Sequence, residues 1–499
     1  MALNEKETEE SVPNETMEKP ESTGQVEQHL NKVYNVWTAS AYQVLMMASW
    51  TCNLVLYSTV MTLGGPMMLI YSTIIVAIGQ GLVMASLGEL CSVWPYSGGQ
   101  QTFTKHLAPP VARRFLSYCT GWVVLMGEIG TAAGIVMNSA QIIGGVVQLS
   151  QPRFELTRWV TFLIYAALLI LSLLFSLSQR HLPAVAVLGG FITLFGGIAW
   201  AATFLALSPK RDTSFVFTEF INSSGYTSSA WVGIMSFYTP VYALYGTDGI
   251  MHIVEEMQDA EKSAPRAMIW SIIFSGVTSL LGALVMGFCI GDWEAYLETD
   301  FPIIPWFVDT LNGSVTGGST MVLIVIVFLN FLIAVSVNVA GSRLAWGMAR
   351  DHALPWSNFF FRINHKLETP LHSTLLVVAA ELALGFVVFG SNYAFQAIVS
   401  MGNAAIQLGY LIPTLVLLVS GRKALPGERA FSLGRLGLAI NVLSVCWTTI
   451  IVIMLFFPLS VPINSENIMN MNWAVMMVGA VVILVTADWF FRGRYQYQV

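Results

Sequence analysis

The stretch Tyr245-Gly246-Thr247-Asp248-Gly249 interrupts a long apolar run of the sequence, and Pro240 lies shortly before it. A charged side chain inside a lipid bilayer is costly unless it faces a cavity or a partner. Backbone groups freed by a helix break are tolerated at that depth only where they line a cavity or are buried in protein. The stretch therefore predicts a membrane helix that is broken at a solute pathway, which indicates transport and not anchoring.

The composition around this stretch is that of a membrane protein. The chain of 499 residues is 55% hydrophobic and 10% charged, with a mean hydropathy of +0.66, whereas a soluble domain carries about 25% charged residues. No nucleophile–base pair, phosphate loop or metal-ligand spacing occurs in the sequence. We therefore expect an all-α integral, multi-pass protein in contact with lipids, without enzymatic activity, cofactor, metal or nucleic-acid partner.

Apolar runs of about 20 residues cross the hydrocarbon core of a bilayer as helices. The sequence predicts twelve such spans, with separators that carry Gly, Pro, Asn or charged residues. Their approximate limits are residues 41–63, 67–90, 114–146, 158–178, 183–207, 231–254, 265–290, 318–347, 371–389, 394–420, 433–457 and 472–491.

The chain divides into three regions by composition. Residues 1–35 are rich in Glu, Ser, Asn and Pro, and such a segment is expected to be disordered because it cannot bury enough apolar surface to fold. Residues 36–425 form the predicted transporter core, and residues 426–499 hold the last two spans and a short tail.

The distribution of Lys and Arg predicts the orientation. With the N-terminus in the cytoplasm, all but four of the 23 Lys and Arg residues fall on the inner side, and the four exceptions are Arg153, Arg158, Lys210 and Arg211. Inner loops of membrane proteins carry this excess of positive charge. Both termini are therefore expected to be cytoplasmic, with the plasma membrane as the expected location.

A second break is expected in the first span. Transporters built from inverted repeats bind solute between two discontinuous helices at corresponding positions of the two halves. The residues of span 1 that correspond to the break in span 6 are Ala48, Ser49, Trp50 and Thr51, which are small or polar apart from Trp50. Ser and Thr also bond within their own helix and Trp50 could serve packing, but an aromatic face also attracts ammonium groups.

Two further residues, His252 and Glu128, are candidates for proton coupling together with Asp248. His252 lies one helical turn after Asp248 and could share a proton with it, although an ordinary hydrogen-bonded role is also open. Glu128 lies between Gly127 and Gly130 in span 3, where close helix approach is possible. Glu381 in span 9 is interpreted as structural.

Four motifs give the chain a resemblance to a known family. They are Gly64-Gly65-Pro66 leading to ASLGEL (85–90) and Pro95-Tyr96-Ser97-Gly98-Gly99-Gln100; Gly121-Trp122; YGTDGIMHIVEEMQDAEKSAPRAM (245–268); and SRLAWGMARDHALP (342–355). The sequence resembles the amino acid–polyamine–organocation superfamily over residues 35–495, and within it the fungal amino acid/choline transporter branch.

The resemblance implies the leucine-transporter-like fold, in which two inverted five-helix repeats are followed by two helices. Residues 48–51 and Tyr245, Gly246, Thr247 and Asp248 would then contact the substrate. The inner gate would be formed by Gly98, Gly99, Glu255, Glu256, Arg350 and Asp351. Glu89 joins the predicted gate set because it falls near an inner helix end.

The substrate predicted from these features is a small nitrogenous solute imported with protons by alternating access. Amino acids including γ-aminobutyrate come first, and choline or a related quaternary amine is the alternative. The bulky Trp50 favours a choline-like or ω-amino substrate over an ordinary α-amino acid. A nutrient sensor that binds without transporting is a further alternative. Span 5 has no Lys or Arg, so the resemblance leaves the coupling ion open.

Overall fold

The computed structural model describes residues 30–151, 153–390, 392–464 and 471–498. Most of the tail predicted for residues 1–35 therefore lies outside the described residues. Within them, ten helical segments are long and apolar enough to cross a membrane. Their bounds are Gly65–Val93, Pro110–Ser150, Arg158–Ser176, Gln179–Leu207, Ala260–Cys289, Val315–Arg350, Leu371–Gly390, Ala397–Ser420, Gly434–Leu455 and Ala474–Gln496.

The two remaining predicted spans are divided into short helices. The first consists of α1 (Val36–Met47), α2 (Ser49–Val55) and α3 (Tyr57–Thr62), and Ala48 between α1 and α2 is left-handed with φ of 34°. The second consists of α10 (Ser229–Met235), α11 (Tyr238–Ala243) and α12 (Gly249–His252). Residues 244–248 between α11 and α12 are not helical, so this break lies where the sequence predicts it.

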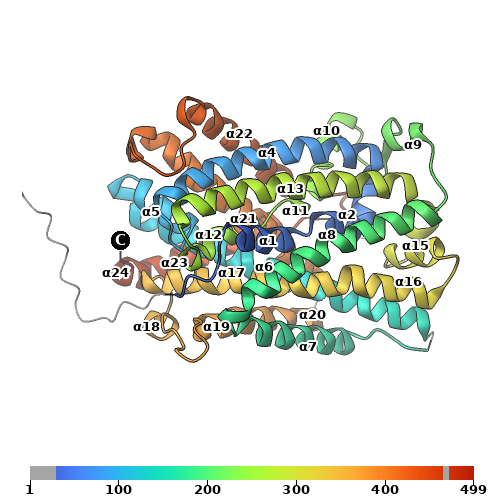
Figure 1. Cartoon of the computed structure of the whole chain (residues 1–499), viewed down its shortest axis with the longest axis horizontal. Helices are drawn as coiled ribbons and strands as arrows, with labels where there is room; N and C mark the ends of the chain where they lie inside the picture. The colour runs from blue at the N-terminus through green and yellow to red at the C-terminus, as the bar shows by residue number, and fades with distance from the viewer. Residues whose placement is uncertain (1–29, 152, 391, 465–470, 499) are drawn as a thin grey trace, which may run out of the picture.

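Three long-range helix pairs organise the bundle (Figure 1). Helix α4 (Gly65–Val93) packs along α13 (Ala260–Cys289), α6 (Pro110–Ser150) along α17 (Phe328–Arg350), and α7 (Arg158–Ser176) along α19 (Leu371–Gly385). Helix α1 lies between α8 (Leu182–Leu207), α13 and α17. The interrupted first span is therefore surrounded by protein, as its free backbone groups require.

A close contact joins α6 to α21 (Asn392–Ser420). A Cβ atom added at Gly130 would lie 3.2 Å from the carbonyl oxygen of Ile398, and one added at Gly402 would lie 3.2 Å from that of Gly127. Small residues permit such backbone approach between membrane helices. We call this contact of Gly127, Gly130 and Gly402 the glycine contact.

The bundle has two ends, and both carry short elements (Figure 1). At one end lie α5 (Gln100–Leu107), α18 (Ser357–Phe360) and α24 (Arg494–Gln496), and we call it the α5 end. At the other, the α9 end, lie α9 (Thr213–Phe217) and α15 (Ile303–Thr310).

The remaining described elements connect or extend these helices. Strands β1 (Leu63–Gly64) and β2 (Ile221–Asn222) pair antiparallel, and α16 (Val315–Val322) runs through the π turn η3 (Leu323–Val327) into α17. Other short pieces are η1 (Gln179–His181), η2 (Val254–Glu256), α14 (Trp293–Leu297), α20 (Val387–Gly390), η4 (Arg422–Ala424) and η5 (Gly434–Leu436). Helices α22 (Gly437–Leu455), α23 (Ala474–Asp488) and η7 (Trp489–Gly493) close the described chain before α24.

Candidate functional site

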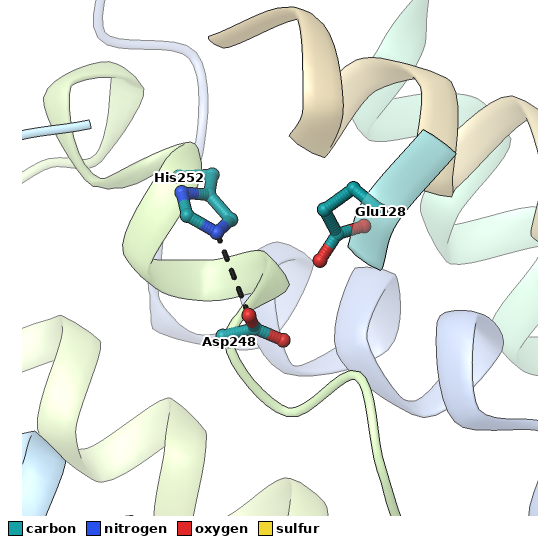
Figure 2. Close-up of side chains that lie close together, drawn as sticks. All are labelled: Glu128, Asp248 and His252. Carbon is teal, nitrogen blue, oxygen red and sulfur yellow. Dashed lines mark ion pairs between the residues drawn. The ribbon is translucent and has the colours of Figure 1, made fainter. Parts of the chain in front are cut away.

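Three buried titratable side chains meet next to the break before α12 (Figure 2). Glu128 of α6, Asp248 and His252 each offer one oxygen or nitrogen atom, and these atoms lie within 4.8 Å of one another. The Nε2 atom of His252 is 3.6 Å from Oδ2 of Asp248. The sequence singles out all three residues separately, and the structure brings them into one cluster, the acid–histidine cluster.

Asp248 is held by donors from two other elements. Gln100 Nε2 at the start of α5 donates to Oδ2 at 2.8 Å, and the Tyr410 hydroxyl of α21 donates to Oδ1 at 2.7 Å. These hydrogen bonds favour the ionised carboxylate, since the acceptor then carries full charge. The sequence does not pair either donor with Asp248, because Gln100 ends one of the quoted motifs without being singled out for this contact, and Tyr410 lies outside the motifs.

A third residue that the sequence does not predict, Gln43, provides hydrogen-bond partners for backbone groups at the helix break. The Gln43 side chain of α1 donates from Nε2 to the Gly246 carbonyl oxygen at 2.5 Å and accepts from the Ile250 N–H at 3.1 Å. A buried backbone group without a partner costs about 1–3 kcal/mol. The interrupted span 6 therefore depends on a side chain from span 1.

Glu128 is arranged differently from Asp248. It is 1% exposed, and neither carboxylate oxygen has a hydrogen-bond partner among the described residues. It lines a cavity of about 170 Å³ together with Met46, Met47, Cys52 and residues of α6, α17 and α21. Since pockets for drug-sized ligands measure about 300–1,000 Å³, this cavity suits a small solute.

The cavity wall is aromatic on the side of the broken span 6. Tyr238, Tyr242 and Tyr245 line it there, Phe395 of α21 also lines the cavity, and the described lining residues include no Lys, Arg or His. Aromatic faces and a carboxylate both attract cations. The described lining of this cavity therefore favours positive over negative charge.

The acid–histidine cluster also has consequences for charge. Two buried carboxylates at this separation resist ionising together unless a cation or proton compensates them. Two carboxylates and an imidazole offer a shared proton site, and the same set of atoms could ligate a metal ion. The expectation that no metal binds stays a prediction.

The structure brings only part of the predicted substrate set to the cavity. Tyr245 and Gly246 line it, and Thr247 is buried beside them with no hydrogen-bond partner for its hydroxyl among the described residues. Ala48 forms the break in span 1, and the Ser49 hydroxyl is buried without a described partner. The Thr51 hydroxyl donates back to the Ala48 carbonyl at 2.7 Å, as the alternative reading for Ser and Thr allows.

Trp50 points away from the cavity. Its indole Nε1 donates to the Thr193 carbonyl of α8 at 3.0 Å, and its ring stacks on Trp200 with centroids 5.3 Å apart. A Cβ atom added at Gly282 of α13 would lie 2.9 Å from Trp50 Cβ. The structure therefore places Trp50 in helix packing, which is the role the sequence left open beside substrate contact.

Most predicted gate residues meet at the α5 end. Glu255 accepts from the Ser97 N–H at 2.8 Å and pairs with Arg350 at 2.9 Å. The Ser97 carbonyl bonds with His252 Nδ1 at 3.0 Å. Because Ser97 contacts both, the loop before α5 joins the acid–histidine cluster to the predicted gate.

The remaining predicted gate residues at the α5 end are held by ion pairs and by close packing of glycines. Glu256 pairs with Arg343 at 2.7 Å with both side chains fully buried, and Lys105 pairs with Asp351 at 3.3 Å. A Cβ atom added at Gly347 would lie 2.9 Å from the Gly98 nitrogen, and one added at Gly99 would lie 3.1 Å from the His252 ring. Larger residues at these positions would push the loop away from α17 and α12.

Glu89 is the exception, because it belongs to a separate cluster. It pairs with Arg422 at 2.8 Å and Arg429 at 3.0 Å, and accepts from the Leu433 N–H at 3.0 Å. It therefore ties α4 to residues 422–433, the connection before α22.

A bundle of membrane helices with two interrupted members and a small buried cavity beside their breaks defines the class of secondary transporters. Residues 34–482 match the model of a family described as "Amino acid permease". The chain therefore belongs to this amino acid permease family, within the amino acid–polyamine–organocation superfamily.

The chain is also similar to several curated proteins. It is 28% identical to the choline transporter of Saccharomyces cerevisiae over 475 residues, which is 94% of this chain and 83% of that protein. It is 30% identical to a putative amino acid/polyamine transporter of Macrophomina phaseolina over 412 residues, covering 81% of this chain and 90% of the relative. With amino-acid permease BAT1 of Arabidopsis thaliana it shares 27% over 496 residues, covering 94% and 93%. These relatives are transporters and not enzymes, as the sequence predicts for this chain.

Proposed function

We propose that this protein is a secondary transporter that imports a small cationic amine, of the choline type, by alternating access. The observation that carries the proposal is the unpartnered Glu128 carboxylate in an aromatic cavity whose described lining has no basic side chain. The carboxylate of a zwitterionic amino acid would find no cationic side chain there. An amino acid is the second candidate, favoured by the family to which the chain belongs.

The proposed transport cycle uses the fold of two inverted five-helix repeats followed by two helices, with twelve spans in all. Support comes from the packing of α4 on α13, α6 on α17 and α7 on α19, since each pair joins corresponding members of the two repeats. The excess of Lys and Arg in the segments of the α5 end places this end in the cytoplasm in our proposal. The plasma membrane is the proposed location.

The inner gate in this proposal is the cluster around Ser97 and Glu255. It separates the cavity at Glu128 from a crevice of about 1100 Å³ at the α5 end, which Tyr96, Glu255 and Arg350 line. The described linings of the cavity and the crevice share no residue. Breaking the Glu255–Arg350 and Lys105–Asp351 pairs would open a path between them.

Proton coupling is assigned to the Glu128–Asp248 pair, with His252 as its neighbour. One proton on the pair would relieve the repulsion of the two carboxylates in the empty site. Because Asp248 is stabilised by two donors and Glu128 by none, the proton is proposed to reside on Glu128 while the site is empty. It is proposed to move to the neighbouring Asp248 when the cationic solute contacts the Glu128 carboxylate. Solute import is then coupled to proton import if the proton and the solute cross the membrane in the same transport cycle.

Uptake by a permease-deficient yeast strain tests the function. Labelled choline, γ-aminobutyrate and a mixed amino-acid panel are offered with and without a protonophore. We expect saturable uptake of choline that the protonophore abolishes. Uptake of γ-aminobutyrate or amino acids alone would establish the second candidate, and no uptake by protein present at the cell surface would contradict transport.

A pair of matched acid variants tests the site. Glu128→Gln should lower choline uptake about tenfold or more, as expected for loss of a charge-assisted contact. Glu381→Gln is the control, because Glu381 is equally buried but does not line the cavity. Equal uptake by the two variants would remove Glu128 from the proposed site.

A further inference from the structure

The segment after α24 carries a buried tyrosine at the α5 end. Tyr497 is 1% exposed, whereas Tyr495, two residues earlier, is 68% exposed. The Tyr497 ring lies edge-on to Tyr118 of α6, with ring centroids 5.4 Å apart, and against Trp489 at 6.4 Å. This burial fixes the segment to the bundle although its neighbours face outward.

The polar atoms of Tyr497 are bonded to α5 and α6. Its hydroxyl accepts from Gln101 Nε2 at 3.1 Å and shares a hydrogen bond with Ser117 Oγ at 2.9 Å. Its carbonyl oxygen accepts from the Arg114 guanidinium at 2.5 Å. A single residue therefore joins the last described segment to both helices.

The same contacts extend to the end of α17. Gln101 Nε2 also donates to Asp351 Oδ2 at 3.2 Å, and Lys105 on α5 pairs with Asp351 Oδ1. The backbone N–H of Gln498 donates to the Asp351 carbonyl at 3.0 Å. Residues 497–498 thus contact both sides of the boundary between α5 and α17.

We propose that Tyr497, through Gln101 and Ser117, is a latch that holds the inner gate closed. This inference rests on the proposed function, in which α5 separates from the end of α17 when solute is released to the cytoplasm. Separation would break the contacts of Gln101 with Asp351 or with Tyr497. The latch therefore stabilises the closed state and sets how often the gate opens.

Cysteine accessibility measures the opening directly. Thr131 on α6 is 5% exposed and lines the cavity on the far side of the inner gate, so Thr131→Cys reports on gate opening. Inside-out vesicles carrying the full chain with this substitution are treated with a membrane-impermeant thiol reagent. The chain without it gives the background from its five native cysteines.

Tyr497→Phe in this background removes the bonds of the hydroxyl with Gln101 and Ser117. It should raise the labelling rate about fivefold, because the neutral bond from Gln101 of α5 no longer stabilises the closed state. Tyr497→Ala should raise it further. Tyr495→Phe, the matched control on an exposed tyrosine, should leave the rate unchanged.

Unchanged labelling of Tyr497→Phe would overturn the latch, whether or not Tyr497→Ala folds, because the phenylalanine variant keeps the buried ring. An equal increase with Tyr495→Phe would also overturn it. Labelling requires no solute, so a raised rate in a chain that transports nothing supports the latch and contradicts the proposed function. Unchanged labelling with normal choline uptake contradicts the latch alone.

Discussion

The two interrupted spans differ in how their breaks are stabilised. The break in span 1 is one left-handed residue, Ala48, whose carbonyl accepts from Thr51 within the same segment. The break in span 6 covers residues 244–248, and its polar groups are met by Gln43, Gln100 and Tyr410 from three other elements. A short break can be satisfied locally, whereas a long one that carries an acid couples several helices to one point.

The largest effect is expected at the acid of the longer break. Asp248→Asn removes the charge that Gln100 and Tyr410 stabilise, so solute uptake should be abolished while the protein still reaches the cell surface. Uptake and surface labelling of the same cells measure this. Normal transport by the variant would remove Asp248 from the site and make the two breaks equivalent.

A second test asks whether the hydrogen bonds of Gln43 stabilise the longer break beyond what a buried glutamine contributes elsewhere. Gln43→Leu leaves the Gly246 carbonyl and the Ile250 N–H without their partner, and should cost about 1–3 kcal/mol for each buried group. We expect a clearly lower melting temperature in detergent and reduced uptake.

The control for this test is another buried glutamine. Gln80 of α4 is fully buried, and neither end of its amide has a hydrogen-bond partner among the described residues. Gln80→Leu should therefore leave the melting temperature unchanged or raise it. Equal losses in both variants would mean that the bridge from Gln43 contributes nothing specific.

A smaller effect is expected beside the shorter break. Trp50→Phe removes the hydrogen bond to the Thr193 carbonyl, and should cost about 1 kcal/mol of stability. The KM for solute should not change, because Trp50 faces α8 and not the cavity. A raised KM at an unchanged melting temperature would place Trp50 in substrate binding after all.

The smallest effect is expected inside the shorter break. Thr51→Val keeps the shape of the side chain and removes only its bond to the Ala48 carbonyl, a net loss of about 0.5–1.5 kcal/mol. The melting temperature should fall slightly and uptake should persist. Abolished uptake would show that the span 1 break is as sensitive as that in span 6.

The sequence predicts the break in span 6 because Gly, Pro and Asp stand out in an apolar run, and it predicts the break in span 1 by correspondence with span 6. It also identifies Glu128 and His252 as companions of Asp248, since titratable residues are rare in membrane spans. The whole-chain resemblance leads to the correct family. All of these predictions depend on local composition or on long motifs.

The partners could not be predicted in the same way. Gln43, Gln100 and Tyr410 are ordinary residues of three separate elements, and only the packed bundle brings them to the break. The direction of Trp50 depends on the rotation of a seven-residue helix, which its sequence does not determine. Glu89 pairs with arginines more than 300 positions later in the chain. The sequence therefore does not predict that Glu89 lies apart from the other gate residues.

The glycine contact between α6 and α21 bears on how the specificity of this protein can evolve. Glu128 on α6 and Ile406 on α21 both line the cavity, while Gly127, Gly130 and Gly402 hold the two backbones together beside it. On this side the width of the cavity is set by main chain, and a larger residue at the contact would force the helices apart. Adaptation to a new solute is therefore expected to exchange cavity-lining side chains outside this contact, such as Tyr238 and Tyr242 of the interrupted span 6.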